Sequence, residues 1–139
     1  MTLAESSIYI DMKRLREMLY QAQFHMTKTD RIIYGTPLMN ASGEALGAYV
    51  VAFETIETKQ HYMDLCIGYF ARLRADLEFC VQQNIIKFPK RTPKPDEDPN
   101  DPYNKVSSRK VELFALIAKI DKEIRSYRAS TKGKTLCDN

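Results

Sequence analysis

The chain has 139 residues, of which 21 are Lys or Arg and 18 are Asp or Glu, and its formal net charge is +3. Folding at this length removes about two-thirds of the chain's surface from water, which is enough for one core without disulfides or metal. The 44% hydrophobic content is globular, no apolar run approaches the ~18 residues of a membrane span, and only five glycines are present, which weighs against a glycine-rich phosphate loop.

The location expected from the sequence is cytoplasmic, with no membrane association. The start of the chain contains no basic stretch followed by an apolar one, so we expect no export. The three cysteines are an odd number, and reduced thiols are their simplest state.

The first predicted element is an amphipathic helix over about residues 7–26. Ser6 or Ser7 can cap it, because a hydroxyl there accepts hydrogen bonds from the free amides of the first turn. The apolar side chains recur at alternating steps of four and three residues, the pattern of a helix with one buried face. They are Ile8, Met12, Leu15, Leu19, Ala22 and Met26.

A second helix is predicted over about residues 30–57, with two alternative starts. Thr29 or Asp30 can cap it, in which case Pro37 should kink the helix, because proline removes a backbone donor. Alternatively, Thr36 caps a helix with Pro37 at its first position, where the missing donor costs nothing. The predicted buried stripe is Gly35, Met39, Ser42, Leu46, Tyr49, Phe53 and Ile56.

Two further helices are predicted over about residues 58–85 and 106–128. Residues 87–105 between them contain five of the six prolines, so they predict a long loop that is extended or mobile. It is either a self-neutralising linker or a strand that docks on a partner. Residues 130–139 are predicted as a flexible tail. The stripes are Tyr62, Cys66, Tyr69, Leu73, Leu77, Cys80 and Asn84 for the third helix, and Val106, Leu113, Ile117, Ile120, Ile124 and Tyr127 for the fourth.

These four helices predict the fold class. Their stripes have a period near 3.5 residues, which favours coiled-coil-like packing of long neighbouring helices. We therefore expect an all-α fold in one domain over residues 1–139. Its predicted topology is an antiparallel up-down-up-down four-helix bundle with a long proline-rich loop between helices three and four.

No arrangement of residues in the sequence indicates catalysis. His25 and His61 lie in different predicted helices, and neither has a second ligand at the spacing of a metal site. A nucleophile needs a base that a third group orients, and no such pattern is visible. We therefore expect a protein that is not an enzyme, with no catalytic residue, no metal and no cofactor.

Gly43 and Gly47 form a small-xxx-small pattern within the second predicted helix. Glycine inside a helix costs about 1 kcal/mol relative to alanine, so a compensating contact is expected. Close approach of another helix supplies one, and that helix can belong to the same chain or to a neighbouring subunit. Both glycines are therefore candidate contacts of a close helix pair or of a homo-oligomer.

The small net charge hides an uneven distribution along the chain. Residues 1–86 carry 8 basic and 10 acidic side chains, whereas residues 106–139 carry 8 basic and 4 acidic ones. A dense positive surface neutralises phosphates, so this end is a candidate nucleic-acid interface, and the alternative is an ordinary solvated basic face. The candidate binding residues are Lys119, Lys122, Arg125, Arg128, Lys132 and Lys134.

Several segments resemble a known family. The stretch from Met26 to Gly35, MTKTDRIIYG, resembles the turn and second-helix start of the small four-helix-bundle proteins encoded in ribosomal RNA intervening sequences. This family includes Avd, the accessory variability determinant of diversity-generating retroelements. Leu73-Arg74 resembles a segment of the family's third helix, and residues 120–127, IDKEIRSY, resemble its closing motif.

The resemblance implies a non-enzymatic bundle that forms a homopentameric ring and binds nucleic acid, with a reverse transcriptase as partner in the case of Avd. Lys122 matches the basic residue of the family's closing motif. We therefore expect a non-catalytic, oligomeric accessory factor that binds DNA, RNA or a nucleoprotein enzyme. The alternative is a scaffolding module with no nucleic-acid role, which uses the Gly43 and Gly47 surface and the proline-rich loop.

Overall fold

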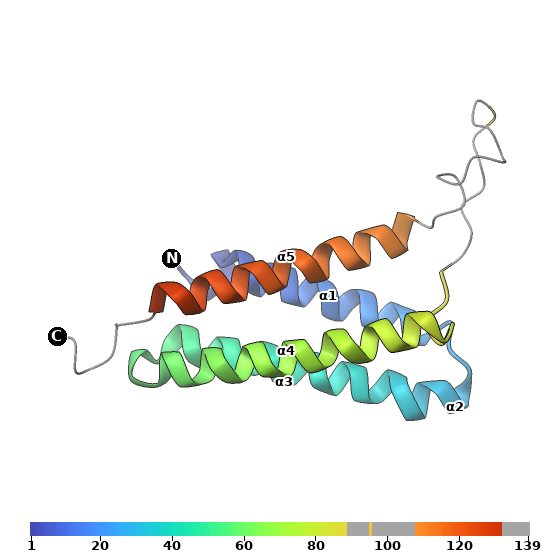
Figure 1. The fold of residues 1–139 in the computed structure, drawn as a ribbon, viewed down its shortest axis with the longest axis horizontal. Coiled ribbons are helices and arrows are strands. Elements are labelled where there is room, and N and C mark those ends of the chain that lie inside the picture. Colours follow the sequence, from blue (N-terminus) through green and yellow to red (C-terminus); the bar gives the residue numbers. More distant parts are fainter. Residues whose placement is uncertain (89–94, 96–107, 132–139) are drawn as a thin grey trace.

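The computed structural model describes residues 1–88, 95 and 108–131, so most of the predicted loop and tail lies outside it. Within these ranges the chain is helical and contains no strand, which confirms the predicted all-α class. None of the described helices is both long and apolar enough to cross a membrane. The long helices lie side by side in Figure 1: α1 (Ser7–Gln23), α3 (Thr36–Glu54), α4 (Lys59–Gln82) and α5 (Ser108–Thr131).

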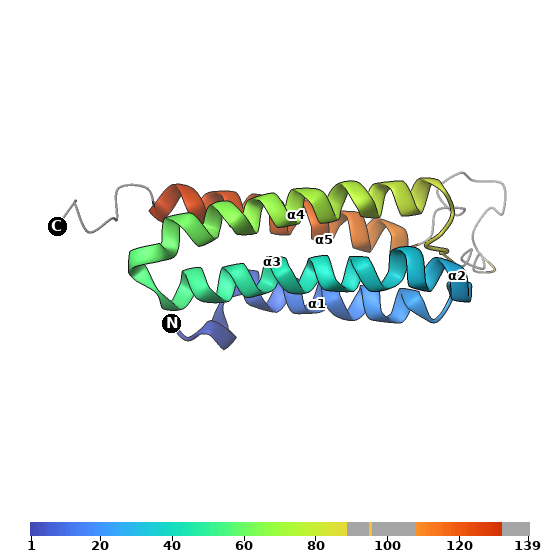
Figure 2. The same cartoon turned by 90° about the horizontal axis from the view of Figure 1, so that it is seen from below.

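The four long helices enclose one core, because each packs against two others. α3 has its most extensive contact with α4, α1 contacts α3 and α5, and α5 contacts α4. α1 and α5 form one layer, which lies above α3 and α4 in Figure 1, and in Figure 2 the layer of α3 and α4 faces the viewer with α1 and α5 behind it. The largest fully buried side chains between these layers are Tyr49, Phe70, Leu15, Met63, Leu73, Leu77, Ile120 and Ile124.

α1 begins at the cap that the sequence predicts. A short 3₁₀ turn, η1 (Leu3–Glu5), precedes it, and Ser6 Oγ accepts a hydrogen bond from Tyr9 N at 3.4 Å. The helix ends at Gln23, three residues earlier than predicted, although Met26 in the following turn is still buried. The predicted stripe is confirmed at its largest residues, which are Ile8, Met12, Leu15 and Leu19.

The second long helix begins at Lys28, and Thr27 is its N-cap. Thr27 has an extended backbone, and its Oγ1 accepts a hydrogen bond from Asp30 N at 3.1 Å. The predicted caps at Thr29, Asp30 and Thr36 are wrong, because Thr27 already accepts from the free amides of the first turn. The helix continues without a break through α2 (Lys28–Asp30) and η2 (Arg31–Gly35) into α3.

Pro37 therefore lies inside a long helix. The turn ahead of it, Arg31–Gly35, is a π-helix in which Thr36 N donates to the Arg31 carbonyl. In a regular α-helix, the ring of Pro37 would clash with the Ile33 carbonyl four residues back, and a wider π-turn relieves this clash. The disturbance predicted at Pro37 takes the form of this π-turn.

The buried face of α3 differs from the predicted stripe. Ser42 and Tyr49 are buried as predicted, but Leu46 and Phe53 are only partly buried, and Ile56 after the helix is 60% exposed. Alanine side chains are buried on this face instead, because neighbouring helices can approach alanine more closely than leucine or phenylalanine. The buried residues of α3 are Leu38, Ser42, Ala45, Ala48, Tyr49 and Ala52.

A left-handed residue turns the chain after α4. Asn84 has φ 58°, a conformation that asparagine tolerates, and the amides of Ile85 and Ile86 donate to the Cys80 carbonyl at 2.8 and 3.2 Å. Asn84 is exposed, so its predicted place on the buried stripe is wrong. The turn instead brings Ile85 and Ile86 into the core.

Replacing Thr27 with alanine tests the cap. We expect Thr27→Ala to lower the free energy of unfolding by about 1 kcal/mol, the usual loss for an N-cap hydroxyl. Chemical denaturation measures it. Thr29→Ala is the matched control, because Thr29 is exposed in the same turn and its change should stay within about 0.5 kcal/mol. Equal losses in the two variants would contradict the assignment.

Candidate functional site

Two of the predicted basic residues pair with carboxylates of neighbouring helices. Lys119 Nζ lies 3.0 Å from Asp11 Oδ2 of α1. Arg128 is bidentate to Asp64 of α4, with Nε–Oδ1 at 2.6 Å and Nη2–Oδ2 at 3.3 Å. These pairs tie α5 to the rest of the bundle, so both residues have a structural role in the single chain.

The other candidates of α5 differ in their surroundings. Arg125 Nε lies 3.1 Å from Asp121 Oδ1, one turn earlier on the same helix. Lys122 is exposed, and Lys132 and Lys134 lie outside the described residues. Three of the candidate basic residues, Lys119, Arg125 and Arg128, therefore have carboxylate partners within the described chain.

Asp11 is the centre of a polar cluster between α1 and α5. Its side chain is only 8% exposed, and it contacts Lys119, Ser7 Oγ at 3.5 Å and the carboxyl of Glu123. Burial alone would raise the pKa of Asp11, but hydrogen bonds from Glu123 and Lys119 and the Lys119 charge outweigh it, so the pKa is lowered. Burial and the contact with Asp11 raise the pKa of Glu123. Folding therefore favours the ionised form of Asp11 and disfavours the ionised form of Glu123.

The buried thiols are poorly suited to chemistry. Burial raises the pKa of Cys66 to about 12 and that of Cys80 to about 11. The thiolate is the reactive form of cysteine, so neither thiol is a nucleophile near neutral pH. Among residues 1–88 and 108–131, no three His, Cys, Asp or Glu side chains cluster as metal ligands would. His25 and His61 are both exposed.

The two glycines predicted as close contacts do not hold two helices of this chain together. A Cβ at Gly43 would lie 3.4 Å from Arg16 Nη2 of α1, an ordinary contact distance, and a Cβ at Gly47 would meet nothing within 4 Å. Gly47 is exposed, whereas Ala45 and Ala48 occupy the buried side of α3. The space beside Gly47 is thus open on the surface of the described chain.

A groove lies on this side of the molecule, between α1 and α3. Its volume is about 280 Å³, and its lining includes Tyr20 and Met39. Met39 lies one helical turn from Gly43 and two from Gly47, so the three share one stripe of α3. We call this surface the α1–α3 face, which consists of Lys13, Arg16, Glu17, Tyr20, Met39, Gly43 and Gly47.

An exposed aromatic pair continues this surface along α1. Tyr20 and Phe24 meet edge to face with ring centroids 5.1 Å apart. They are 56% and 62% exposed, which is high for side chains whose rings usually dominate cores and interfaces. Ile10, also on α1, is 51% exposed. The outer side of α1 therefore exposes more apolar area than is expected of a helix face that contacts only water.

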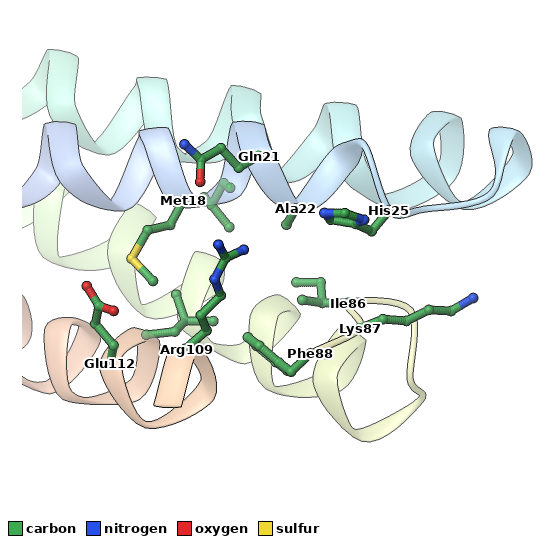
Figure 3. A pocket seen from close by; sticks show the side chains of 11 residues that line it. Met18, Gln21, Ala22, His25, Ile86, Lys87, Phe88, Arg109 and Glu112 are labelled. Atoms are coloured by element: carbon green, nitrogen blue, oxygen red, sulfur yellow. The ribbon is translucent and has the colours of Figure 1, made fainter. Parts of the chain in front are cut away.

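A second hollow, the end cleft, lies between α1 and α5 near the end of α4. It encloses about 250 Å³, and its lining includes the buried side chains of Leu19, Ile86 and Leu113. In Figure 3 the Arg109 side chain extends across the cleft from α5 toward α1, and His25 lies at the same end of α1. The sequence did not predict this cleft, because its walls come from segments far apart in the chain.

Comparisons with known proteins do not assign the chain to a family: no family model matches it, and no curated protein or solved structure matches it significantly. The resemblance to the ribosomal RNA intervening-sequence proteins and Avd therefore stays a prediction. The class of protein that the described fold defines is an all-α helical bundle.

The Asp11 cluster predicts a pH dependence of stability. A carboxyl whose pKa is lowered by folding stabilises the fold above its unfolded pKa, and this contribution disappears as the pH falls through the folded value. We expect Asp11→Asn to lower the free energy of unfolding at pH 7 by about 1 kcal/mol, and the deficit should shrink below about pH 4. Urea denaturation at pH 7, 5 and 3 measures it.

Glu123→Gln is the matched control for this test. Folding raises the pKa of Glu123, so its ionisation opposes folding as the pH rises through the raised value. The amide removes that penalty, and we expect stability at pH 7 to be unchanged or higher. A loss in Asp11→Asn that is as large at pH 3 as at pH 7 would contradict the role given to the ionised carboxylate.

Proposed function

We propose that the protein is a non-catalytic helical-bundle accessory factor that assembles with copies of itself and binds nucleic acid or a nucleoprotein enzyme such as a reverse transcriptase. The observation that carries the proposal is the open α1–α3 face, where a Cβ added at Gly47 would meet nothing within 4 Å. Glycine in a helix costs about 1 kcal/mol relative to alanine, and contact with a second copy would offset it. The exposed Tyr20 and Phe24 rings add apolar area beside this surface.

The finer topology belongs to the same proposal. We take the chain as an antiparallel up-down-up-down bundle in which the proline-rich loop joins α4 to α5. The short turns at residues 24–27 and 55–58 support this topology, because short connections place consecutive helices beside each other in opposite directions. The contacts of α3 with both α1 and α4 agree with it.

The partners and burial of the titratable groups support a role without catalysis. Asp11 and Glu123 join α1 to α5, and the thiols of Cys66 and Cys80 are held in the unreactive form. Perturbed titratable groups are common at active sites, but they also occur in structural networks, and here their partners link helices. A structural role in joining helices accounts for Asp11 and Glu123, which supports the proposal of a protein without catalysis.

Nucleic-acid binding is proposed for the outer side of α5. The side chains of Lys119 and Arg125 remain 60% and 56% exposed despite their partners, and Lys122 is exposed as well. An exposed ion pair such as Arg125 with Asp121 contributes at most about 1 kcal/mol, so a phosphate can replace the carboxylate with little loss. Symmetric assembly would bring several copies of this basic stripe together and raise the positive electrostatic potential around it.

Gly47→Arg tests the assembly. We expect a large charged side chain at this exposed glycine to block packing of a second copy, so the mass measured by light scattering should fall to that of one chain. Gly68→Arg is the matched control, because Gly68 is also an exposed helical glycine at which an added Cβ would meet nothing within 4 Å. A single-chain mass for the unmodified protein, or the same mass for both variants, would contradict assembly through this face.

The double variant Lys122→Glu, Arg125→Glu tests the nucleic-acid interface. We expect it to abolish binding to single- or double-stranded DNA or RNA, measured at two salt concentrations. Each lost phosphate contact should reduce the slope of log affinity against log salt by about 1. Absent or salt-independent binding by the unmodified protein would exclude a nucleic-acid role. The scaffolding alternative, which shares the α1–α3 face, would then be favoured.

A further inference from the structure

We propose that the end cleft between α1 and α5 binds a small amphiphilic anion, a ligand with an apolar body and one anionic head group. This inference goes beyond the proposed function and does not depend on it. It rests on a buried apolar floor, on the cationic side chains at its rim, and on the pairing of the one acidic residue there. Each of these comes from described residues of α1, α5 and the turn after α4.

The floor of the cleft is apolar and is part of the core. Leu19, Ile86 and Leu113 are each 3% exposed or less, yet all three border the cleft. Met18 and Phe88, which are partly buried, extend the apolar lining. The volume of about 250 Å³ is just below the ~300 Å³ at which sites for drug-sized ligands begin, so the ligand body must be small.

The rim of the cleft favours negative charge. Lys87 from the turn after α4 and Arg109 from the first turn of α5 supply positive charge, and His25, two residues after the end of α1, adds an imidazole N–H donor. Glu112 is the acidic side chain of the lining, and it forms an ion pair with Arg14 of α1, so its charge is already balanced. The lining therefore offers an anion more cationic than anionic partners.

Arg109 is the residue best placed to hold the head group. Its side chain extends over the cleft in Figure 3, whereas the Lys87 ammonium points away from it. The planar guanidinium can donate two parallel hydrogen bonds to a carboxylate, sulfonate or phosphate, which fixes orientation as well as charge. An apolar body would then lie against Leu19, Ile86 and Leu113 beneath it.

The experiment uses the full chain and two probes. The fluorescence of 8-anilinonaphthalene-1-sulfonate, an amphiphilic anion, should rise saturably at one site per chain, and octanoate should displace it. We expect Arg109→Gln to weaken both probes about tenfold, or about 1.4 kcal/mol, because the amide keeps a hydrogen-bond donor but loses the charge. Lys110→Gln is the matched control, because Lys110 is an exposed cation on the same turn that does not line the cleft. Its affinity should equal that of the unmodified protein.

A second variant tests the apolar part. Ala22 lines the cleft and is only partly buried, so Ala22→Leu should fill the space and abolish saturable binding while the melting temperature stays unchanged. If that variant fails to fold, Arg109→Gln and its control still decide the outcome. Absent saturable binding would overturn the proposal, and so would equal weakening in Arg109→Gln and Lys110→Gln. If octanol displaced the dye as effectively as octanoate, the proposal would also be overturned, because the site would then bind any hydrophobic group without regard to charge.

Discussion

The contact of α5 with α1 and α4 is the interaction on which the rest of the structure depends. Residues 83–107 separate α5 from α4, so no short turn holds it in place. Ile120 and Ile124 are fully buried in this contact, and burial of such side chains contributes about 1.5–3 kcal/mol each. The ion pairs to Asp11 and Asp64 add less energy but select one register, because each carboxylate belongs to a different neighbouring helix.

Much of the fold follows from the spacing of large apolar residues, and the exceptions have identifiable causes. The stripes of α1 and α5 are strong because leucine and isoleucine, together with methionine in α1, recur on one side of each helix. α3 is different, since Ala45, Ala48 and Ala52 provide its buried face and alanine carries little hydrophobic signal in a sequence. The start at Thr27 was missed because a threonine two residues later is an equally good cap by residue type alone.

The candidate site was less predictable, because it depends on residues brought together by folding. Charge counting identified Lys119 and Arg128 as exposed cations, but their partners lie 108 and 64 residues earlier in the chain. One local signal existed for Asp11, which is three residues after Ile8 and so lies on the buried side of α1. No comparable sequence pattern predicts the end cleft, because its lining comes from three separate segments.

The π-turn ahead of Pro37 has a geometric consequence for the whole second helix. One extra residue in a turn rotates everything before it by about 100° relative to everything after it. Ile32 and Ile33 within the turn are 64% and 54% exposed, and Leu38 after it is 3% exposed. The π-turn therefore sets the rotation of α2 about the helix axis relative to α3. A change in length of one position there would rotate Lys28–Asp30 by about 100° relative to α3 without altering any other side chain.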